Sequence, residues 1–209
     1  MDWPLQPEWE GEDVFVLGGG PSVRHFPLER LKVRRVIGCN DAYLFGRSVV
    51  DVVVFGDPKW YHHHKGKPDF INFSGPKITN SPKLEGCVGI TWAPRQDRGF
   101  AYDAIGWNGN TGSAAINVAL LLGALRIFLV GFDMQVDKDG NSNWHPNLLD
   151  KPTEEHYNRY KQGIGSTACQ IAAYWPGVEV WNLNPESTMD TFPKTTWEKV
   201  FGKEALCLK

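Results

Sequence analysis

The chain has 209 residues, a formal net charge of −2 and a hydrophobic fraction of 42%. A chain of this length can bury one sizeable core but is short for two full domains, so we expect a single domain over residues 1–209. The nearly balanced charge argues against a protein that tracks nucleic-acid phosphates, because such proteins carry a basic surplus. The four cysteines are scattered and form no CxxC pair, which argues against a zinc site and a disulfide scaffold.

The N-terminal segment, MDWPLQPEWEGED, is acidic and lacks the basic and apolar regions of a secretory signal. The longest apolar run, at 114–125, is too short to span a bilayer. We therefore expect a cytoplasmic protein without a membrane span.

Short apolar runs alternate with helical patterns along the chain. Three helices are predicted, at Pro27–Leu31, Ser113–Leu125 and about Thr153–Trp175. The alternation predicts an α/β, Rossmann-like domain whose mostly parallel sheet has helices on both faces. The predicted strands are Val14–Leu17, Arg35–Cys39, Asp51–Phe55, Lys77–Thr79, Val88–Trp92, Arg126–Val130 and Val178–Trp181.

The segments outside this pattern have separate expected roles. Residues 1–12 form an N-terminal extension, and residues 135–152 are expected to form a loop over the site. The glycine-rich stretch 92–111 predicts a flexible loop across the same edge of the sheet. The tail, 192–209, mixes apolar residues with lysines, and the sequence leaves open whether it docks on its own domain or on a second subunit of a homo-oligomer.

Four predicted strands end in small and polar residues. In parallel sheets, ligands bind outside the carboxyl ends of the strands, so these four ends predict one shared pocket. The strand ends are Gly18-Gly19-Gly20-Pro21-Ser22, Cys39-Asn40-Asp41, Gly56-Asp57-Pro58 and Gly131-Phe132-Asp133.

The GGGPS loop is typical of a phosphate contact. Glycines between a strand and a helix let the backbone approach a phosphate, and the helix N-terminus supplies free N–H groups. The Lys-Ser/Thr pair of a Walker A loop is missing, and Val23 stands where a dinucleotide fingerprint has its third glycine. An NAD site with Asp41 as the ribose acid and a tight turn without a ligand remain alternatives.

Three further motifs have an ordinary structural interpretation beside a functional one. In NTGSAA, 110–115, Thr111 or Ser113 can cap a helix whose end would also contact an anion at the same edge. DKDGNSN, 137–143, lacks the closing Glu of a calcium loop and predicts a turn on Asp139-Gly140. The adjacent imidazoles of HHHK, 62–65, cannot face one way, so a solvated turn is favoured over a metal site.

Taken together, VFVLGGGPSV, VIGCNDAY and NTGSAAINVALLLGALRIFLVGFDM resemble the bacterial sialyltransferases of glycosyltransferase family 42, over roughly residues 13–145. The relatives of that family include motility-associated flagellin glycosyltransferases, archaeal-type hydroxymethyl-dihydropterin diphosphokinases and phage-encoded proteins. The resemblance implies a cytidine-nucleotide site. In it, Gly19, Gly20 and Ser22 face phosphate and ribose, Asn40 holds the nucleotide or donor sugar, Thr111 and Gly112 contact the donor carboxylate, and Gly131 and Asp133 border base and ribose.

The resemblance also implies a general base in the stretch after Asp133, where His145 is the candidate. A histidine ordinarily titrates near neutrality, as a base for an acceptor hydroxyl requires. His156 competes, but its place in a predicted amphipathic helix favours a structural or solvated role. Met134 replaces the family tyrosine that helps to stabilise the leaving phosphate, and no tyrosine follows in 135–150. Other donors are then required, such as Arg95, Arg98 or Trp144.

We therefore expect glycosyl transfer from a CMP-sugar to a sugar or alcohol acceptor, without a required metal. The first alternative is a diphosphokinase acting on a pterin-like alcohol, in which Asp57 and Asp133 hold magnesium on ATP. The second is a non-catalytic nucleotide- or sugar-binding protein that keeps the pocket.

Overall fold

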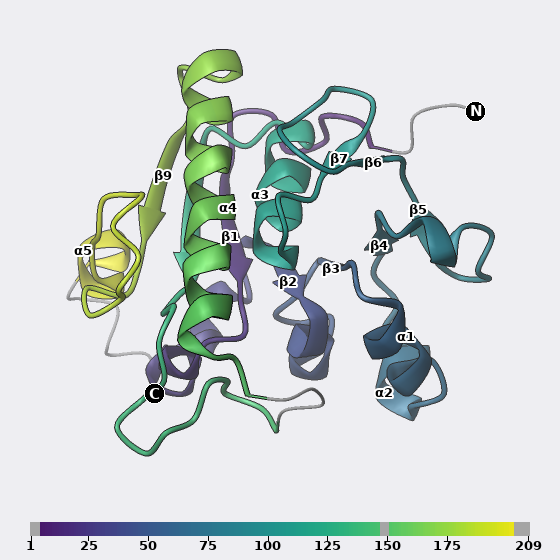
Figure 1. The fold of residues 1–209 in the computed structure, drawn as a ribbon, viewed down its shortest axis with the longest axis horizontal. Helices are drawn as coiled ribbons and strands as arrows, with labels where there is room; N and C mark the ends of the chain where they lie inside the picture. The colour runs from purple at the N-terminus through teal and green to yellow at the C-terminus, as the bar shows by residue number, and fades with distance from the viewer. Residues whose placement is uncertain (1–4, 147–150, 203–209) are drawn as a thin grey trace.

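A computed structural model describes residues 5–146 and 151–202 and shows a parallel seven-stranded sheet (Figure 1). The strand order is β5-β4-β3-β2-β1-β8-β9, and every neighbouring pair is parallel. The Rossmann-like α/β class predicted from the alternation is confirmed. The strands are β1 (Asp13–Leu17), β2 (Arg35–Cys39), β3 (Val52–Phe55), β4 (Lys77–Thr79), β5 (Thr91–Trp92), β8 (Arg126–Val130) and β9 (Glu179–Asn182).

The central strands are apolar throughout because both of their faces are buried. In β1, Val14 and Val16 join one hydrophobic core, whereas Phe15 and Leu17 join a second core on the opposite face. Strand β8 alternates in the same way and pairs in register with β1. This burial on two sides explains why the strands read as continuous apolar runs rather than as alternating ones.

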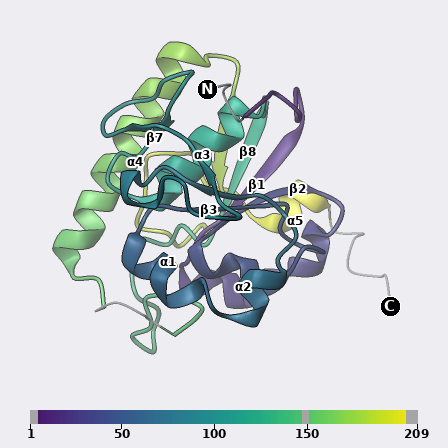
Figure 2. The same ribbon diagram turned by 90° about the vertical axis from the view of Figure 1, so that its right-hand side faces the viewer.

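Helices cover both faces of the sheet (Figure 2). One core contains residues of α3 (Thr111–Leu121) and α4 (Glu154–Tyr174). The other contains residues of α1 (Pro58–His64) and α2 (Pro68–Asn72), and α5 (Trp197–Phe201) packs against it. The described residues also form four 3-10 helices: η1 (Pro21–His25), η2 (Leu28–Leu31), η3 (Asn40–Phe45) and η4 (Pro82–Leu84).

Several predicted bounds were wrong for local reasons. Helix α3 ends at Leu121 instead of Leu125, because Gly123 has a left-handed φ of 96° and packs against the backbone of Glu10. The helix predicted at Pro27–Leu31 is the 3-10 helix η2, and β5 is shorter than predicted.

The stretch predicted as a flexible loop across the sheet edge contains a second, two-stranded sheet. Strands β6 (Arg95–Gln96) and β7 (Ile105–Gly106) pair in parallel. The N–H of Gly106 also donates to Oδ1 of Asn117 on α3, at 2.7 Å. This stretch is therefore tied to the domain core.

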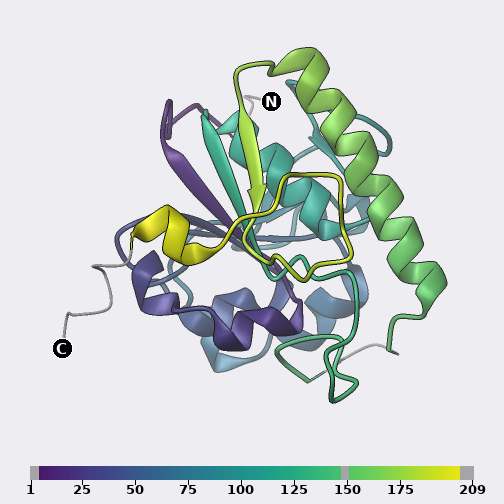
Figure 3. The same cartoon turned by 90° about the vertical axis from the view of Figure 1, so that its left-hand side faces the viewer.

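Both terminal segments pack on the domain as far as they are described. The N–H of Trp9 donates to the carbonyl of Leu122 at 2.8 Å, and the Trp9 side chain is buried. Phe201 of α5 stacks on Phe15 with ring centroids 5.5 Å apart, so the described part of the tail docks on its own domain (Figure 3). Residues 1–4 and 203–209 of the predicted extension and tail lie outside the described residues. None of the described helices combines the length and apolarity needed to cross a membrane.

The strand order places a crevice in the middle of the sheet. The chain starts at β1, runs outward through β2, β3 and β4 to β5, and then returns to add β8 on the other side of β1. The connections leaving β1 and β8 therefore diverge to opposite sides. Such a switch point is where ligands bind in open α/β sheets.

Candidate functional site

One cavity of about 660 Å³ lies at the carboxyl ends of the central strands. Its volume is in the range of small-molecule binding sites. Nine of the ten residues predicted for the site line it, so the tertiary structure brings together positions from four strand ends, the start of α3 and the loop after β8. These residues are Gly19, Gly20, Asn40, Asp57, Thr111, Gly112, Gly131, Asp133 and His145.

The three glycines after β1 have different roles. A Cβ on Gly20 would lie 2.1 Å from Oδ2 of Asp133, and one on Gly18 would lie 2.7 Å from the carbonyl oxygen of Gly131. These two glycines therefore let the loop pack against the end of β8. A Cβ on Gly19 would instead meet the side chains of Asn143 and His145, at 3.0 and 3.7 Å. Of the three Cβ positions, that of Gly19 thus points toward the side chains of Asn143 and His145, in the loop that carries the predicted base.

Ser22, the tenth predicted residue, differs from its expected position. It is not among the residues that line the cavity, and its backbone N–H donates to Oδ2 of Asp133 at 2.9 Å. The N–H groups of Gly18 and Gly20 are also used, by the carbonyls of Val130 and Gly131. The chain then enters a five-residue 3-10 helix rather than an α-helix. The N–H groups of Gly20 and Ser22 are therefore engaged within the protein, and a phosphate contact of the loop through Gly19 stays a prediction.

Helix α3 provides a better-founded anion contact. Its N-cap is Asn110, not Thr111 or Ser113: Oδ1 of Asn110 accepts from the N–H of Ser113 at 2.8 Å. Thr111 and Gly112 are the first two helical residues, and their N–H groups have no intrahelical partner. Both residues line the cavity, so the positive end of an eleven-residue helix faces it.

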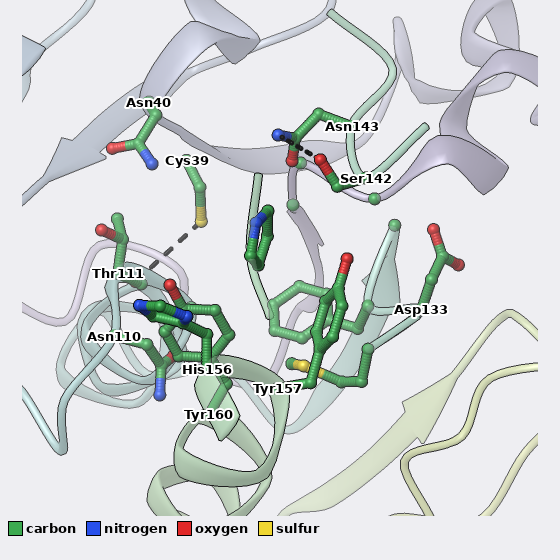
Figure 4. A pocket seen from close by; sticks show the side chains of 18 of the residues that line it. Cys39, Asn40, Asn110, Thr111, Asp133, Ser142, Asn143, His156, Tyr157 and Tyr160 are labelled. Atoms are coloured by element: carbon green, nitrogen blue, oxygen red, sulfur yellow. Dashed lines mark hydrogen bonds between the residues drawn. The ribbon is translucent and has the colours of Figure 1, made fainter. Parts of the chain in front are cut away.

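The first turns of α4 add four side chains, of which the sequence reasoning had considered only His156. His156, Tyr157, Arg159 and Tyr160 line the cavity, and Figure 4 shows the two tyrosines extending from α4 toward the strand ends. His156 also forms a capping box with Thr153, which is the structural role predicted for it. The available signal was the position of these residues at the start of a helix that directly follows the loop over the site.

Tyr157 has an unusual environment. Its hydroxyl is buried and has no hydrogen-bond partner among the described residues. Burial, and secondarily the negative charge of Asp133, raises the pKa of Tyr157, so the hydroxyl keeps its proton at neutral pH. A buried hydroxyl without a partner is costly, and a ligand oxygen in the cavity would satisfy it.

The other donors predicted for the leaving group were wrong, because none of the three lines the cavity. The guanidinium of Arg95 lies over the ring of Trp107, 4.5 Å from its centroid, and pairs with Asp97. The indole N–H of Trp144 donates to the carbonyl of Gly18 at 3.2 Å. Arg98 lies in the loop between β6 and β7.

His145 is carried by the loop that follows β8, of which residues 147–150 lie outside the described chain. The N–H of Trp144 donates to the carbonyl of Gly19 at 3.0 Å, and Arg24 donates to the carbonyl of Asn143, also at 3.0 Å. These bonds join the loop to the GGGPS segment and to η1. Within the loop after β8, residues 137–141 form the predicted turn, and the Asp137 carboxylate accepts hydrogen bonds from the N–H groups of Asp139 and Asn141.

The residues after β2 are held in a restricted conformation. Asn40 has a positive φ of 51°, and its Oδ1 is buried with no partner among the residues that the structure describes. Asn40 lies on the opposite side of the cavity from Asp133 (Figure 4). Burial raises the pKa of the neighbouring Cys39 thiol to about 12, so this thiol is protonated and not a nucleophile at neutral pH.

The predicted carboxylate pair is occupied by protein contacts. Asp57 is the N-cap of α1 and accepts from the N–H of Lys59 at 2.7 Å. Both oxygens of Asp133 accept hydrogen bonds, one from Ser22 and one from the Asn184 amide. Across the described residues, no group of three or more His, Cys, Asp or Glu side chains is placed to hold a metal ion.

The HHHK segment was predicted as a solvated turn, but its histidines form the last turn of α1 and one of them is buried. His62 and His63 are exposed in the last turn of the helix, whereas His64 is buried. The three imidazoles thus face different directions, as predicted from their adjacency. Burial lowers the pKa of His64 to about 4, so it is neutral at pH 7.

Comparison with solved structures shows which proteins share this arrangement. The sialyltransferase CstII from Campylobacter jejuni, in complex with cytidine-5'-monophosphate, superposes with a TM-score of 0.57 at 14% identity and covers 90% of this chain and 86% of its own. The MAf glycosyltransferase from Magnetospirillum magneticum AMB-1 gives a TM-score of 0.62 at 13% identity, over 92% of this chain and 34% of its own.

The chain has the fold of these glycosyltransferases. A further structure of the Campylobacter sialyltransferase, with a trisaccharide acceptor and CMP, gives a TM-score of 0.53 at 14% identity over 88% of this chain and 86% of that one. No protein-family profile matches the chain, and no curated protein sequence is detectably similar to it. The glycosyltransferase fold is thus shared at the level of structure, with little sequence identity.

Proposed function

We propose that this protein transfers a glycosyl group from a cytidine nucleotide sugar to a hydroxyl acceptor, with His145 as the general base. The carrying observation is that His145, Gly19 and the N-terminus of α3 line the same cavity at the switch point of the sheet. The cavity therefore combines an anion contact with a residue able to accept a proton.

The residues divide the chemistry as follows. The N–H groups of Thr111 and Gly112 hold an anionic group of the donor, and the Arg159 guanidinium adds a positive charge at the cavity wall. Nε2 of His145 takes the proton of the acceptor hydroxyl as its oxygen bonds to the anomeric carbon. The bond from that carbon to the phosphate oxygen breaks, and the electron pair leaves with CMP.

Tyr157 is the proposed donor to the leaving phosphate. Its buried hydroxyl has no partner in the described part of the chain and faces the same cavity. A hydrogen bond to the developing phosphate charge would satisfy it and stabilise the leaving group. Tyr157, on α4, thus supplies the hydroxyl that is missing at Met134, which follows β8.

The solved structures support the donor class. The Campylobacter sialyltransferase with this fold binds CMP, a CMP-3FNeuAc analogue and a trisaccharide acceptor. CMP-sialic acid is therefore the first donor to test. The mechanism needs no metal, because the phosphate charge is met by helix N–H groups, a tyrosine hydroxyl and an arginine.

The first experiment measures the thermal midpoint with CMP, CMP-sialic acid, UDP, GDP, ATP and NAD, each with and without magnesium. A ligand that binds the folded state raises the midpoint by mass action. We expect shifts with the cytidine nucleotides only, in the presence or absence of magnesium. A shift with ATP that requires magnesium would contradict the proposal and favour diphosphate transfer.

The second experiment separates binding from chemistry. In His145→Ala, we expect the CMP shift to persist while transfer to an acceptor falls at least about a hundredfold, as for loss of a general base. His62→Ala is the matched control, because His62 is exposed on α1 and does not line the cavity. Equal turnover in the two variants would exclude His145 as the base.

A further inference from the structure

A buried carboxylate lies next to Nδ1 of the proposed base. Asp41 follows β2, at the start of η3, and is only 8% exposed. Its Oδ2 lies 3.5 Å from Nδ1 of His145, which is within ion-pair distance. Asp41 and His145 come from segments about 100 residues apart in the chain, so this contact depends entirely on the fold.

Helix α1 holds the carboxylate in place. The indole N–H of Trp60 donates to Oδ1 of Asp41 at 2.5 Å, and Nε2 of His64 lies 3.7 Å from the same oxygen. The Trp60 and His64 rings stack 4.3 Å apart at 15°, one helical turn from each other. Nδ1 of His64 is in turn bonded to the hydroxyl of Tyr43 at 2.7 Å. Asp41 is thus fixed on one side while its second oxygen faces His145.

The neutral state of the neighbouring His64 lets the negative charge of Asp41 pair with a protonated His145. His64 is neutral at pH 7 because burial lowers its pKa to about 4. Among the described residues, the basic side chains within 4 Å of the Asp41 carboxylate are His64 and His145. A proton taken up by His145 therefore creates the cation that faces this buried negative charge.

The contacts of His145 also determine its tautomer. Nδ1 lies 2.9 Å from the carbonyl oxygen of Pro146, which can only accept a hydrogen bond. Nδ1 must therefore carry the hydrogen in the neutral ring, and the Asp41 carboxylate favours the same tautomer. Nε2 is then unprotonated, and it lies on the side of the ring toward Gly19, 3.7 Å from where a Cβ of that residue would be.

We propose that Asp41 is the positioning residue of His145. Its carboxylate keeps the hydrogen on Nδ1, directs Nε2 into the cavity and stabilises the imidazolium that forms when the acceptor hydroxyl loses its proton. The proton from the acceptor stays on His145 and is not passed on to Asp41. This inference rests on the proposed function for its kinetic consequence, but the tautomer and the orientation of His145 follow from the fold alone.

The test compares Asp41→Asn with Asp69→Asn. Both variants remove one negative charge, but Asp69 is exposed on α2 and does not line the cavity. The tautomer is read from ¹⁵N chemical shifts of the imidazole, with the His145 signal assigned by its loss in His145→Ala. We expect the Nδ1–H form in the wild type and in Asp69→Asn, and a reduced share of it in Asp41→Asn, where the amide can present a donor to Nδ1.

Kinetics provide the second measurement. In Asp41→Asn we expect kcat for transfer to fall at least about tenfold, with the KM for the donor within about threefold, because a carboxylate behind a histidine acts on the proton transfer. In Trp60→Phe, which removes the donor to Oδ1 but keeps the carboxylate, a smaller fall of kcat is expected. Thermal midpoints and CMP binding show that each variant is folded.

The outcomes separate this inference from the proposed function. If Asp41→Asn changes the tautomer while no variant or wild type transfers sugar, the positioning role stands and the proposed function fails. An Nε2–H tautomer in the wild type overturns the inference. So does an Asp41→Asn variant that is folded and matches Asp69→Asn in both tautomer and kcat.

Discussion

At the scale of single residues, the three consecutive glycines after β1 have separate roles. As a sequence, GGGPS indicates close approach of the backbone to something, and a phosphate was the predicted partner. In the structure, the Cβ positions of Gly18 and Gly20 meet the end of β8, whereas that of Gly19 meets the side chains of Asn143 and His145. Two of the three glycines therefore allow close packing, and the third lies next to the proposed base.

Alanine substitutions at Gly20 and at Gly19 are expected to affect stability and transfer differently. Gly20→Ala places a Cβ against Asp133 and the Gly131 carbonyl, so we expect the free energy of unfolding to fall by about 1–3 kcal/mol. Gly19→Ala meets the Asn143 side chain, which can move, so we expect a loss below about 1 kcal/mol but impaired transfer. Denaturant unfolding and transfer assays measure both. Equal destabilisation by the two substitutions would contradict the assignment.

The hydroxyl of Tyr157 provides a test in which stability and activity change in opposite directions. Removal of a buried hydroxyl without a partner should leave the free energy of unfolding unchanged or raise it by about 1 kcal/mol in Tyr157→Phe. That gain corresponds to a midpoint about 2–4 °C higher for a chain of this size. Transfer should fall at least about tenfold if the hydroxyl stabilises the leaving phosphate.

Tyr160→Phe is the matched control for Tyr157→Phe. Tyr160 lines the same cavity one turn along α4, and its hydroxyl is not among the buried unpartnered groups of the described residues. A Tyr157→Phe variant that is markedly destabilised would mean that the hydroxyl has a partner in solution. Unchanged transfer would remove Tyr157 from the proposed mechanism.

At the scale of elements, α1 illustrates how one short helix serves both core and site. Asp57 caps it at the cavity, and Trp60, Tyr61 and His64 are buried beneath it. From the residue pattern HHHK we predicted that the three histidines face different ways and form a solvated turn, and the second part was wrong. That His64 is only 1% exposed and neighbours Asp41 depends on the packing of α1 against η3.

The buried His64 predicts a specific pH dependence of stability. Its pKa is lowered from 6.5 to about 4 in the folded state, so unfolding takes up a proton between these values. The stabilising contribution is therefore fully present above pH 6.5 and is lost as the pH falls to about 4, with a total of at most about 3 kcal/mol. The free energy of unfolding should thus fall more steeply with decreasing pH in the wild type than in His64→Gln.

The comparison is made by denaturant unfolding at several values between pH 7 and pH 4. His62→Gln is the control, since His62 is exposed in the same helical turn and should keep the wild-type slope. Parallel curves for wild type and His64→Gln would show that folding does not lower the pKa of His64.

At the scale of the whole molecule, the order of the strands decides what the cavity contains. Strand β8 is inserted next to β1 after the chain has built the other half of the sheet. Three carboxylates near the cavity accept hydrogen bonds from the protein. Asp133 accepts from two donors, Asp57 accepts from the N–H of Lys59 at the start of α1, and Asp41 accepts from Trp60. Free carboxylate pairs of the kind that bind magnesium are therefore not part of the proposed chemistry.

Metal removal tests this whole-molecule property. We expect the CMP-dependent rise of the thermal midpoint, and transfer itself, to be unchanged after treatment with EDTA. The reason is that the phosphate charge is met by the N-terminus of α3 and by Arg159, without a bridging cation. A loss in EDTA that magnesium restores would contradict the metal-independent mechanism.

The sequence by itself determined the fold class and the edge of the sheet at which the cavity lies. Arg35–Cys39 and Arg126–Val130 match β2 and β8 because strands buried on both faces are continuous apolar runs with clear ends. The polar residues after those strands could then be assigned to one edge, since all carboxyl ends of a parallel sheet meet there. His145 was predicted as the base from a resemblance confined to short local motifs, and its position at the cavity agrees with that prediction without testing its role.

Only the tertiary structure decided which polar groups face the cavity and which face each other. The Asp133 carboxylate and the N–H of Ser22 bind one another, whereas Tyr157 enters the cavity from α4 and Asp41 lies behind His145. These contacts join residues tens to more than a hundred positions apart. Their partners depend on strand order and on packing between elements, and local patterns contain no information about either.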